Sequence, residues 1–571
     1  LYYTYKRPSS FYSWLFNRIN DTNTLMTVKN PDGSWTKEGA ELIGSLSEGE
    51  AQTTELSLQS QFTMTLALIK NVLSIKADAT ARLGNRETEQ WDSDMNIPYK
   101  QGPNLADEYL GWVDMAQLAK ERDYYTSVNA YIDFTKSFGK HQVSALAGFN
   151  QEYNSHRYMR GEREELISSS LPSVELATGS ARVREDNYEW ATRGGFFRLN
   201  YIYNNKYIFE ANGRYDGSSR FAKGNRWGFF PSASLGWNIY REKFMEPAAD
   251  FLSNLKLRVS YGLLGNQADA GLYTFASNMS LNGGLGGYIF SDGRHIYTNP
   301  APVIDPNTTW EKVESKNIGL DFGFFGNALT GTVDIFQRDT KDMLGPGLEF
   351  PDMFGAVAPQ ANNARMRNRG WELSLNYRGK IGNDIDYSVG GSVSDAVSEV
   401  TEYANAKKND PYGSWYTGRK VGEIWGYRAE GLIQTQEEAD AYNAEYDLSY
   451  ISGKLWEPGD VKYIDLDGNK VIDRGDNRLV DGDMGDQTII GNTTPRYQYT
   501  FNGYISWKGL SLSVMFQGVG KRDWVAGGAY FWGFGPYAQV TVFKEHMDYW
   551  RPDNPGAYYP KPYIHTAGGV V

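Results

Sequence analysis

The chain has 571 residues, 15% of them aromatic, with 40 Tyr, 16 Trp, 61 Gly and no Cys, which excludes disulfides and thiolate metal sites. No run of about 18 apolar residues occurs and the mean hydropathy is -0.55, so a helical membrane protein is excluded. The net charge of -12 argues against a nucleic-acid partner, which would need a basic patch.

Apolar and polar residues alternate with a period of two along much of the chain, and this pattern predicts β-strands. A transmembrane β-strand needs only about 10 residues with every second one apolar, so a low mean hydropathy does not exclude a membrane β-barrel. In chain order, the first predicted strands cover 54–66, 72–83, 124–135 and 142–153.

A hairpin is predicted next, over 197–213. Its apolar residues keep the same phase on both strands: Phe197, Leu199, Tyr201 and Tyr203, then Tyr207, Phe209, Ala211 and Gly213. An unchanged phase requires a loop of odd length if one face is to stay apolar. Asn204, Asn205 and Lys206 supply it as a three-residue loop with one residue near the left-handed region.

Strands at 227–239 and 255–261 precede a second hairpin at 317–338, where the phase of the apolar residues flips. The flip predicts a two-residue turn centred on Gly326 and Asn327, whose residue types favour positive φ. The predicted cross-strand pairs are Phe324 with Leu329, Phe322 with Gly331, and Leu320 with Val333.

Two more strands are predicted at 371–377 and 387–393, followed by a hairpin over 497–516 that turns at Lys508 and Gly509. Its first strand alternates through Tyr497, Tyr499, Phe501, Ile505 and Trp507, and its second through Leu510, Leu512, Val514 and Phe516.

Together these strands predict an all-β fold, a large antiparallel transmembrane β-barrel with its apolar face toward lipid. The opposite, polar face would line a wide interior. It includes Arg198, Asn200, Glu210, Asn212, Arg214, Lys256 and Arg258.

The connections between the predicted strands differ in length. Turns of two or three residues alternate with long links at about 265–312, 340–368 and 398–495, which is typical of the short periplasmic turns and long outer loops of outer-membrane barrels. The alternative is a soluble β-sandwich whose apolar faces cover a core, as in a secreted glycan-binding or adhesion protein.

Several segments also resemble the SusC/RagA-like TonB-dependent transporters of the Bacteroidetes, in the same order along the chain. They are GRYDGSSRF at 213–221, NRWGFFPSASLGW at 225–237, REKF at 241–244, LKLRVSYGLLGNQ at 255–267, WEKVESKNIGLDFGFF at 310–325, DIFQRDTKDML at 334–344, NRGWELSLNYR at 368–378, GDVKYIDLDGNKVID at 459–473 and IGNTTPRYQYTFNGYISWKGLSLSVMFQGVG at 490–520.

The resemblance implies a bacterial outer-membrane barrel of about 22 strands, plugged by an N-terminal domain. It also implies a SusD-like surface lipoprotein as a lid, energy from TonB, and oligosaccharides or oligopeptides as cargo. Neither a plug nor a TonB-contacting segment is recognisable, and 558–571 lacks the expected terminal aromatic strand. We therefore interpret 1–571 as a partial barrel domain, incomplete at both ends, that would contact TonB through a segment missing here.

One acidic segment, DLDGNKVIDRGD at 465–476, has the ligand spacing of a calcium loop. Positions 1, 3, 5, 9 and 12 carry oxygen ligands, and position 7 offers a backbone carbonyl. The residues concerned are Asp465, Asp467, Asn469, Asp473, Asp476 and, for the carbonyl, Val471. Lys470 occupies position 6, where a calcium loop has Gly, so an acidic loop built from Asx turns stays an equal alternative. Any calcium here would be structural.

Aromatic residues in the long loops are candidates for contacting substrate or the lid: Trp415, Tyr416, Trp425, Tyr427 and Trp532. Packing within the loops is an equally good explanation. The five His are scattered and no nucleophile elbow or phosphate loop occurs, so the sequence predicts a transporter rather than an enzyme.

Overall fold

The computed structural model describes most of the chain. The described residues are 2–8, 27–41, 49–92, 98–103, 105–109, 114–267, 270–279, 281–282, 289–290, 293–294, 297–347, 350–404, 414–452, 454–475, 484–527, 531, 543–563, 565–566 and 569–570. Within them, no helix is long and apolar enough to cross a lipid bilayer.

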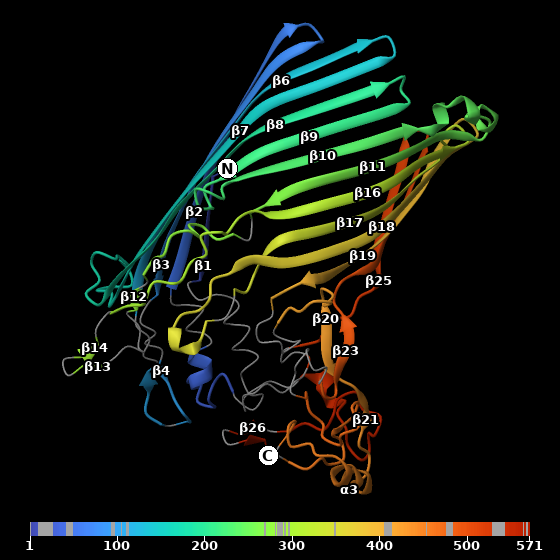
Figure 1. The fold of residues 1–571 in the computed structure, drawn as a ribbon. Coiled ribbons are helices and arrows are strands. Elements are labelled where there is room, and N and C mark those ends of the chain that lie inside the picture. Colours follow the sequence, from blue (N-terminus) through green and yellow to red (C-terminus); the bar gives the residue numbers. More distant parts are fainter. Residues whose placement is uncertain are drawn as a thin grey trace.

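One antiparallel sheet of 15 strands dominates the structure and forms a curved wall of tilted strands (Figure 1). Each strand pairs with its neighbours in chain order. The strands are β1 (Tyr2–Pro8), β2 (Gly49–Ile69), β3 (Leu73–Asp92), β6 (Met115–Phe138), β7 (His141–Glu164), β8 (Ala181–Tyr203), β9 (Tyr207–Ser218), β10 (Trp227–Asn238), β11 (Leu252–Asn266), β16 (Glu311–Phe324), β17 (Leu329–Gly345), β18 (Ala361–Ile381), β19 (Ile385–Glu402), β24 (Arg496–Trp507) and β25 (Leu510–Lys521).

The remaining elements lie in the connections. Short strand pairs are β4 (Pro98–Tyr99) with β5 (Glu108–Tyr109), β12 (Leu281–Asn282) with β15 (Tyr297–Thr298), β13 (Ile289–Phe290) with β14 (Gly293–Arg294), β20 (Glu423–Tyr427) with β23 (Gln487–Asn492), β21 (Ala429–Leu432) with β22 (Val461–Tyr463), and β26 (His565–Thr566) with β27 (Gly569–Val570). Among the described residues, helical segments include 37–41, α3 (Gln436–Glu445) and the short 3₁₀ segments η1 (Ile239–Arg241), η2 (Lys243–Ala248), η3 (Asp352–Phe354) and η4 (Lys544–Met547).

All three predicted hairpins have the predicted register. Phe324 pairs with Leu329, Trp507 with Leu510, and Tyr203 with Tyr207. The turn at Gly326 is closed by the Ala328 amide, which donates to the Phe325 carbonyl at 3.1 Å. The three-residue loop differs in one detail, because both Asn204 and Asn205 have positive φ where one such residue was expected.

Most strands are longer than their alternating segments predict. β6 and β7 each have 24 residues, whereas about 10 suffice to cross a bilayer. The extra length is mostly polar on both faces, so it carries only a weak alternating signal. For the same reason, part of the predicted 340–368 loop is strand, since β17 continues to Gly345 and β18 begins at Ala361.

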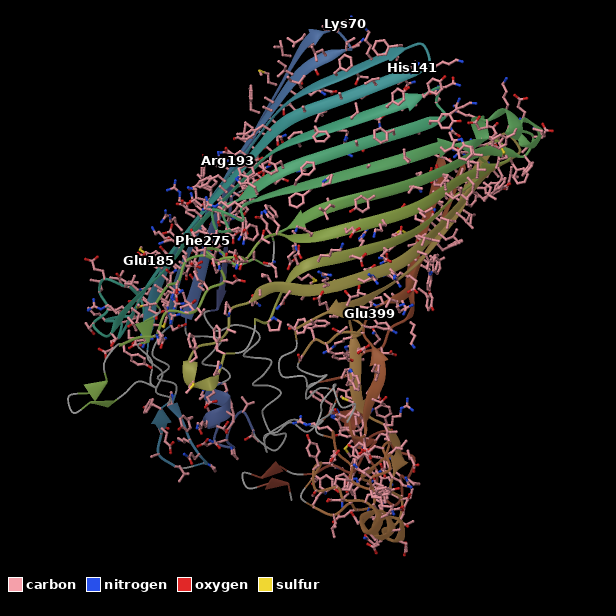
Figure 2. All side chains as sticks on the ribbon, in the orientation of Figure 1. Lys70, His141, Glu185, Arg193, Phe275 and Glu399 are labelled. Carbon is pink, nitrogen blue, oxygen red and sulfur yellow. The ribbon has the colours of Figure 1, made fainter. Side chains whose placement is uncertain are left out.

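Short and long connections lie at opposite ends of the strands. At the strand ends that carry Lys70 and His141, tight turns lie at 70–72, 139–140, 204–206, 325–328, 382–384 and 508–509. Glu399 lies toward the opposite strand ends (Figure 2). Those opposite strand ends carry the long links 267–310, 346–360 and 403–495. One link at the strand ends with tight turns, 239–251, is longer and holds η1 and η2.

The two faces of the sheet differ in chemistry. On the apolar face, Phe62, Leu235 and Leu512 are 67%, 60% and 60% exposed, so no second layer of described residues covers them. Buried apolar clusters occur in the connections instead: one holds Ile433, Ala439, Tyr442, Leu448, Trp456 and Ile472, and a second holds Phe221, Phe230, Ala270 and Trp310. Within the described part of the chain, the sheet therefore has no dry core of the kind a soluble sandwich requires.

Candidate functional site

The polar face of the sheet is a wall of charged and amide side chains joined across strands. The seven residues predicted to line the interior all lie on it, since Arg198 pairs with Asn212 and Asn200 with Glu210 on the face opposite Leu199. Arg258 shows how the charges are balanced: its guanidinium donates to Asp321 at 2.8 and 2.9 Å and to Asp334 at 3.0 and 3.2 Å. Such a face suits a wet or plugged interior.

Three of the five predicted aromatic residues lie together, and two of them lie over one cation. The Arg419 guanidinium lies 5.0 Å from the Trp415 ring centre and 5.8 Å from that of Tyr416. Tyr416 and Trp425 meet at 6.5 Å and 71°. The Tyr416 hydroxyl donates to Glu423 at 2.8 Å, and burial, together with this carboxylate, raises the pKa of the phenol. Trp415 is 41% exposed and could stack on a ligand.

Tyr427 is placed elsewhere. Its ring packs on Tyr463 at 5.5 Å, against the cluster around Ile433 and Tyr442. This residue fits the packing explanation rather than the contact explanation. Trp532 lies outside the described residues.

The region expected to be one long loop contains a small folded insertion with its own core, over 423–492. Thr435 caps α3 by accepting from the Glu438 amide, and the Tyr442 hydroxyl donates to the Tyr463 carbonyl at 2.8 Å. A late segment of the chain docks on it, because Trp550 Nε1 donates to Gln434 at 3.0 Å and the Tyr563 hydroxyl to Asp460 at 2.6 Å. Hydropathy alone did not indicate this core.

The acidic segment forms a tight loop in which side-chain oxygens accept backbone amides. Asp465 accepts from Gly468 and Lys470 at 2.7 and 3.0 Å, and Asn469 accepts from Val471 at 2.6 Å. Asp473 accepts from Gly475 at 2.7 Å. The contacts of Asn469 and Asp473 are Asx turns, as the alternative explanation requires, whereas Asp465 bonds amides three and five residues further on. Asp476 lies outside the described residues.

A residue that sequence spacing missed completes an acidic cluster at this loop. Ligand oxygens of Asp465, Asp467 and Asp486 lie within 4.8 Å of one another. Asp486 is fully buried and accepts from the Leu466 and Asp473 amides at 2.6 and 3.0 Å. Burial raises the pKa of this carboxyl, and the charges of Asp467 and Asp465 add to the effect. Calcium at the loop stays a prediction.

Comparison with known proteins decides the family. Residues 1–540 match the family model described as TonB dependent receptor-like, beta-barrel. The chain belongs to this family of TonB-dependent receptor barrels. Membership accounts for the large antiparallel sheet with an outward apolar face, and it assigns the chain to the bacterial outer membrane.

Individual relatives of this TonB-dependent receptor barrel support the assignment. The TonB-dependent receptor SusC of Bacteroides thetaiotaomicron is 30% identical over 426 residues, which is 73% of this chain and 40% of SusC. The TonB-dependent receptor P3 of Formosa agariphila is 27% identical over 68% of this chain and 38% of its own length. The structure of the RagAB peptide transporter superposes with a TM-score of 0.70 at 21% identity, covering 91% of this chain and 54% of that one. The chain thus spans about half the length, or less, of these relatives.

Proposed function

We propose that the chain supplies barrel wall to an importer that takes up oligosaccharides or oligopeptides across the outer membrane. The observation that carries this is the pairing of an exposed apolar face with a charged opposite face on one continuous sheet. A lipid-facing outside and a hydrated inside explain both faces at once. Such a protein would move its cargo without breaking a bond in it, so we propose no enzymatic role.

The partners follow from the same proposal. Energy would come from TonB, and a SusD-like lipoprotein would close the outer mouth. Support comes from the SusC likeness and from the fold shared with the RagAB peptide transporter. We further propose that the Trp415–Tyr416–Trp425 cluster contacts cargo or the lid, because its members converge in the longest connection and Trp415 is exposed.

The rival function is a soluble secreted binding protein. It would have to bury the apolar face of the sheet, yet Phe62, Leu235 and Leu512 stay exposed. A purified full-length protein that remains monodisperse without detergent would favour the rival.

Uptake by the native bacterium tests the importer. Cells lacking the full-length gene should lose uptake of labelled oligosaccharides or oligopeptides, and the restored gene should return it. A protonophore should abolish the restored uptake, because TonB-driven transport needs the proton gradient. Equal uptake with and without the gene would contradict the proposal.

The aromatic cluster is tested in the same assay. Trp415→Ala should raise the half-saturating cargo concentration by about tenfold, equivalent to about 1.4 kcal/mol of lost contact. Trp524→Ala is the matched control, because Trp524 is 75% exposed and is not part of the cluster. Equal effects from both variants would leave the cluster without a role in binding.

We also propose that the Asp465–Asp467–Asp486 cluster holds a structural calcium ion. Three carboxylates so close together repel one another unless a cation or protons balance them. All-oxygen ligands suit calcium, which would stiffen the insertion.

A further inference from the structure

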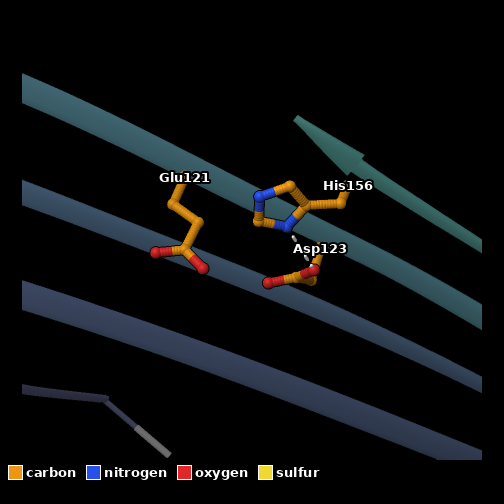
Figure 3. Close-up of side chains that lie close together, drawn as sticks. All are labelled: Glu121, Asp123 and His156. Carbon is orange, nitrogen blue, oxygen red and sulfur yellow. Dashed lines mark hydrogen bonds and ion pairs between the residues drawn. The ribbon is translucent and has the colours of Figure 1, made fainter. Parts of the chain in front are cut away.

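A second group of ligating side chains lies on the polar face, far from the acidic loop in sequence. Glu121 and Asp123 project from β6 and His156 from β7, and their ligand atoms all lie within 4.8 Å of one another (Figure 3). Asp123 and His156 are directly opposite in the strand register. His156 Nδ1 and Asp123 Oδ1 are 2.9 Å apart. Two hydrogen-bonded strands therefore hold the three side chains in place.

The polar face is assigned to these residues by alternation along β6. Tyr124, Val128 and Ile132 are 41%, 47% and 50% exposed on the apolar face. Residues at odd positions of the same strand, including Glu121 and Asp123, point to the opposite side. The group thus lines the interior of the barrel.

An aromatic ring covers one face of the imidazole. Tyr188 of β8 stacks on His156 with ring centres 4.6 Å apart and planes at 15°. The His156 side chain is only 12% exposed. Across Asp123 on β3 lies Gly84, which has no side chain to fill the space. The group is therefore supported from β8, and residue 84 on β3 adds no side chain against it.

Among the residues that the structure describes, Glu121 has no hydrogen-bond or ion-pair partner, although its charge acts on Arg86. Arg86 lies opposite it on β3 but is engaged elsewhere. Its Nε lies 3.2 Å from Glu55, and its Nη2 donates to the Tyr5 hydroxyl at 3.3 Å. Two carboxylates this close to one another repel, and a bound cation would relieve that repulsion.

We propose that Glu121, Asp123 and His156 bind a divalent transition-metal ion of the Zn²⁺ type. An imidazole nitrogen with two carboxylates is a donor set that such ions favour, whereas calcium and magnesium prefer oxygen alone. The metal would bind an unprotonated ring nitrogen of His156, and the other ring nitrogen would keep its proton. Three protein ligands leave a fourth position open toward the interior, where water or a donor group of a passing solute can bind. This inference rests on the fold, and it stands apart from the identity of the cargo.

Metal titration of the full-length protein in detergent tests the site. After treatment with a chelator, the protein should bind one Zn²⁺ per chain in competition with a chromophoric chelator, at a site absent from His156→Ala. Glu121→Gln preserves size and should weaken binding by about tenfold or more. Co²⁺ in the site should give the visible absorption of a four-coordinate ion in wild type and lose it in both variants.

His141→Ala is the matched control, because His141 is an exposed histidine at the start of the same strand. Asp467→Asn is a second control that separates this site from the acidic loop. Both controls should bind Zn²⁺ like wild type. Unchanged binding in His156→Ala and Glu121→Gln, or no stoichiometric binding by a wild-type protein with native circular dichroism, would overturn the proposal.

Discussion

At the scale of single residues, the carboxylate oxygens of the acidic loop can either accept backbone hydrogen bonds or bind a cation. Asp465 and Asp467 satisfy backbone amides, yet they lie beside the buried Asp486. The Asx turns need no cation, whereas the like charges favour one. Spacing along the chain identified Asp465 and Asp467 but not Asp486, because that residue reaches the loop through the fold of the insertion.

Calcium should slow amide exchange in this loop. At a concentration about 100 times its Kd, bound calcium stabilises a protein by about 2.7 kcal/mol, so the Gly468 and Lys470 amides should exchange more slowly, as measured by hydrogen–deuterium exchange. Asp467→Asn should remove most of that protection. Glu437→Gln, which deletes one exposed charge from α3, should keep it. Exchange that does not respond to calcium in wild type would show that the turns suffice.

At the scale of elements, turns and alternation together determine register. The same reasoning that paired Phe324 with Leu329 extends to the β6–β7 hairpin. A two-residue turn at Gly139 and Lys140 puts Asp123 opposite His156, as observed. The pairing of Asp123 with His156, two ligands of the proposed metal site, thus follows from the sequence. The halves of the strands next to the long connections could not be predicted, because both of their faces are mostly polar and carry little periodic signal.

The Gly326 turn allows the register argument to be tested. Gly326 has φ of 65°, and a Cβ placed there would meet no atom within 4 Å, so the cost of a substitution is conformational. Gly326→Val should destabilise the full-length protein by about 1–2 kcal/mol in urea unfolding. Gly326→Asn should cost clearly less, because Asn tolerates positive φ. Equal stability of the two variants would mean that the turn does not need left-handed backbone.

At the scale of the whole molecule, the alternating strands and the order of the family motifs were enough to predict an antiparallel outer-membrane barrel fold. The insertion at 423–492 was not predicted, because its core draws on residues spread from Ile433 to Ile472 and on a segment near Trp550. Contacts of that range leave no local pattern. Local periodicity in the sequence predicts the strands of the barrel wall, whereas the insertion at 423–492 depends on tertiary packing.

The apolar face of the sheet should meet lipid, and the polar face should meet water. Because the chain has no Cys, Leu512→Cys and Ser513→Cys each introduce a single site for a nitroxide spin label. In the full-length protein in lipid bilayers, oxygen dissolved in the lipid should relax the label at position 512 strongly, and a water-soluble nickel reagent should relax the label at position 513. A label at 512 that is shielded from both reagents, as in a dry protein core, would contradict the account.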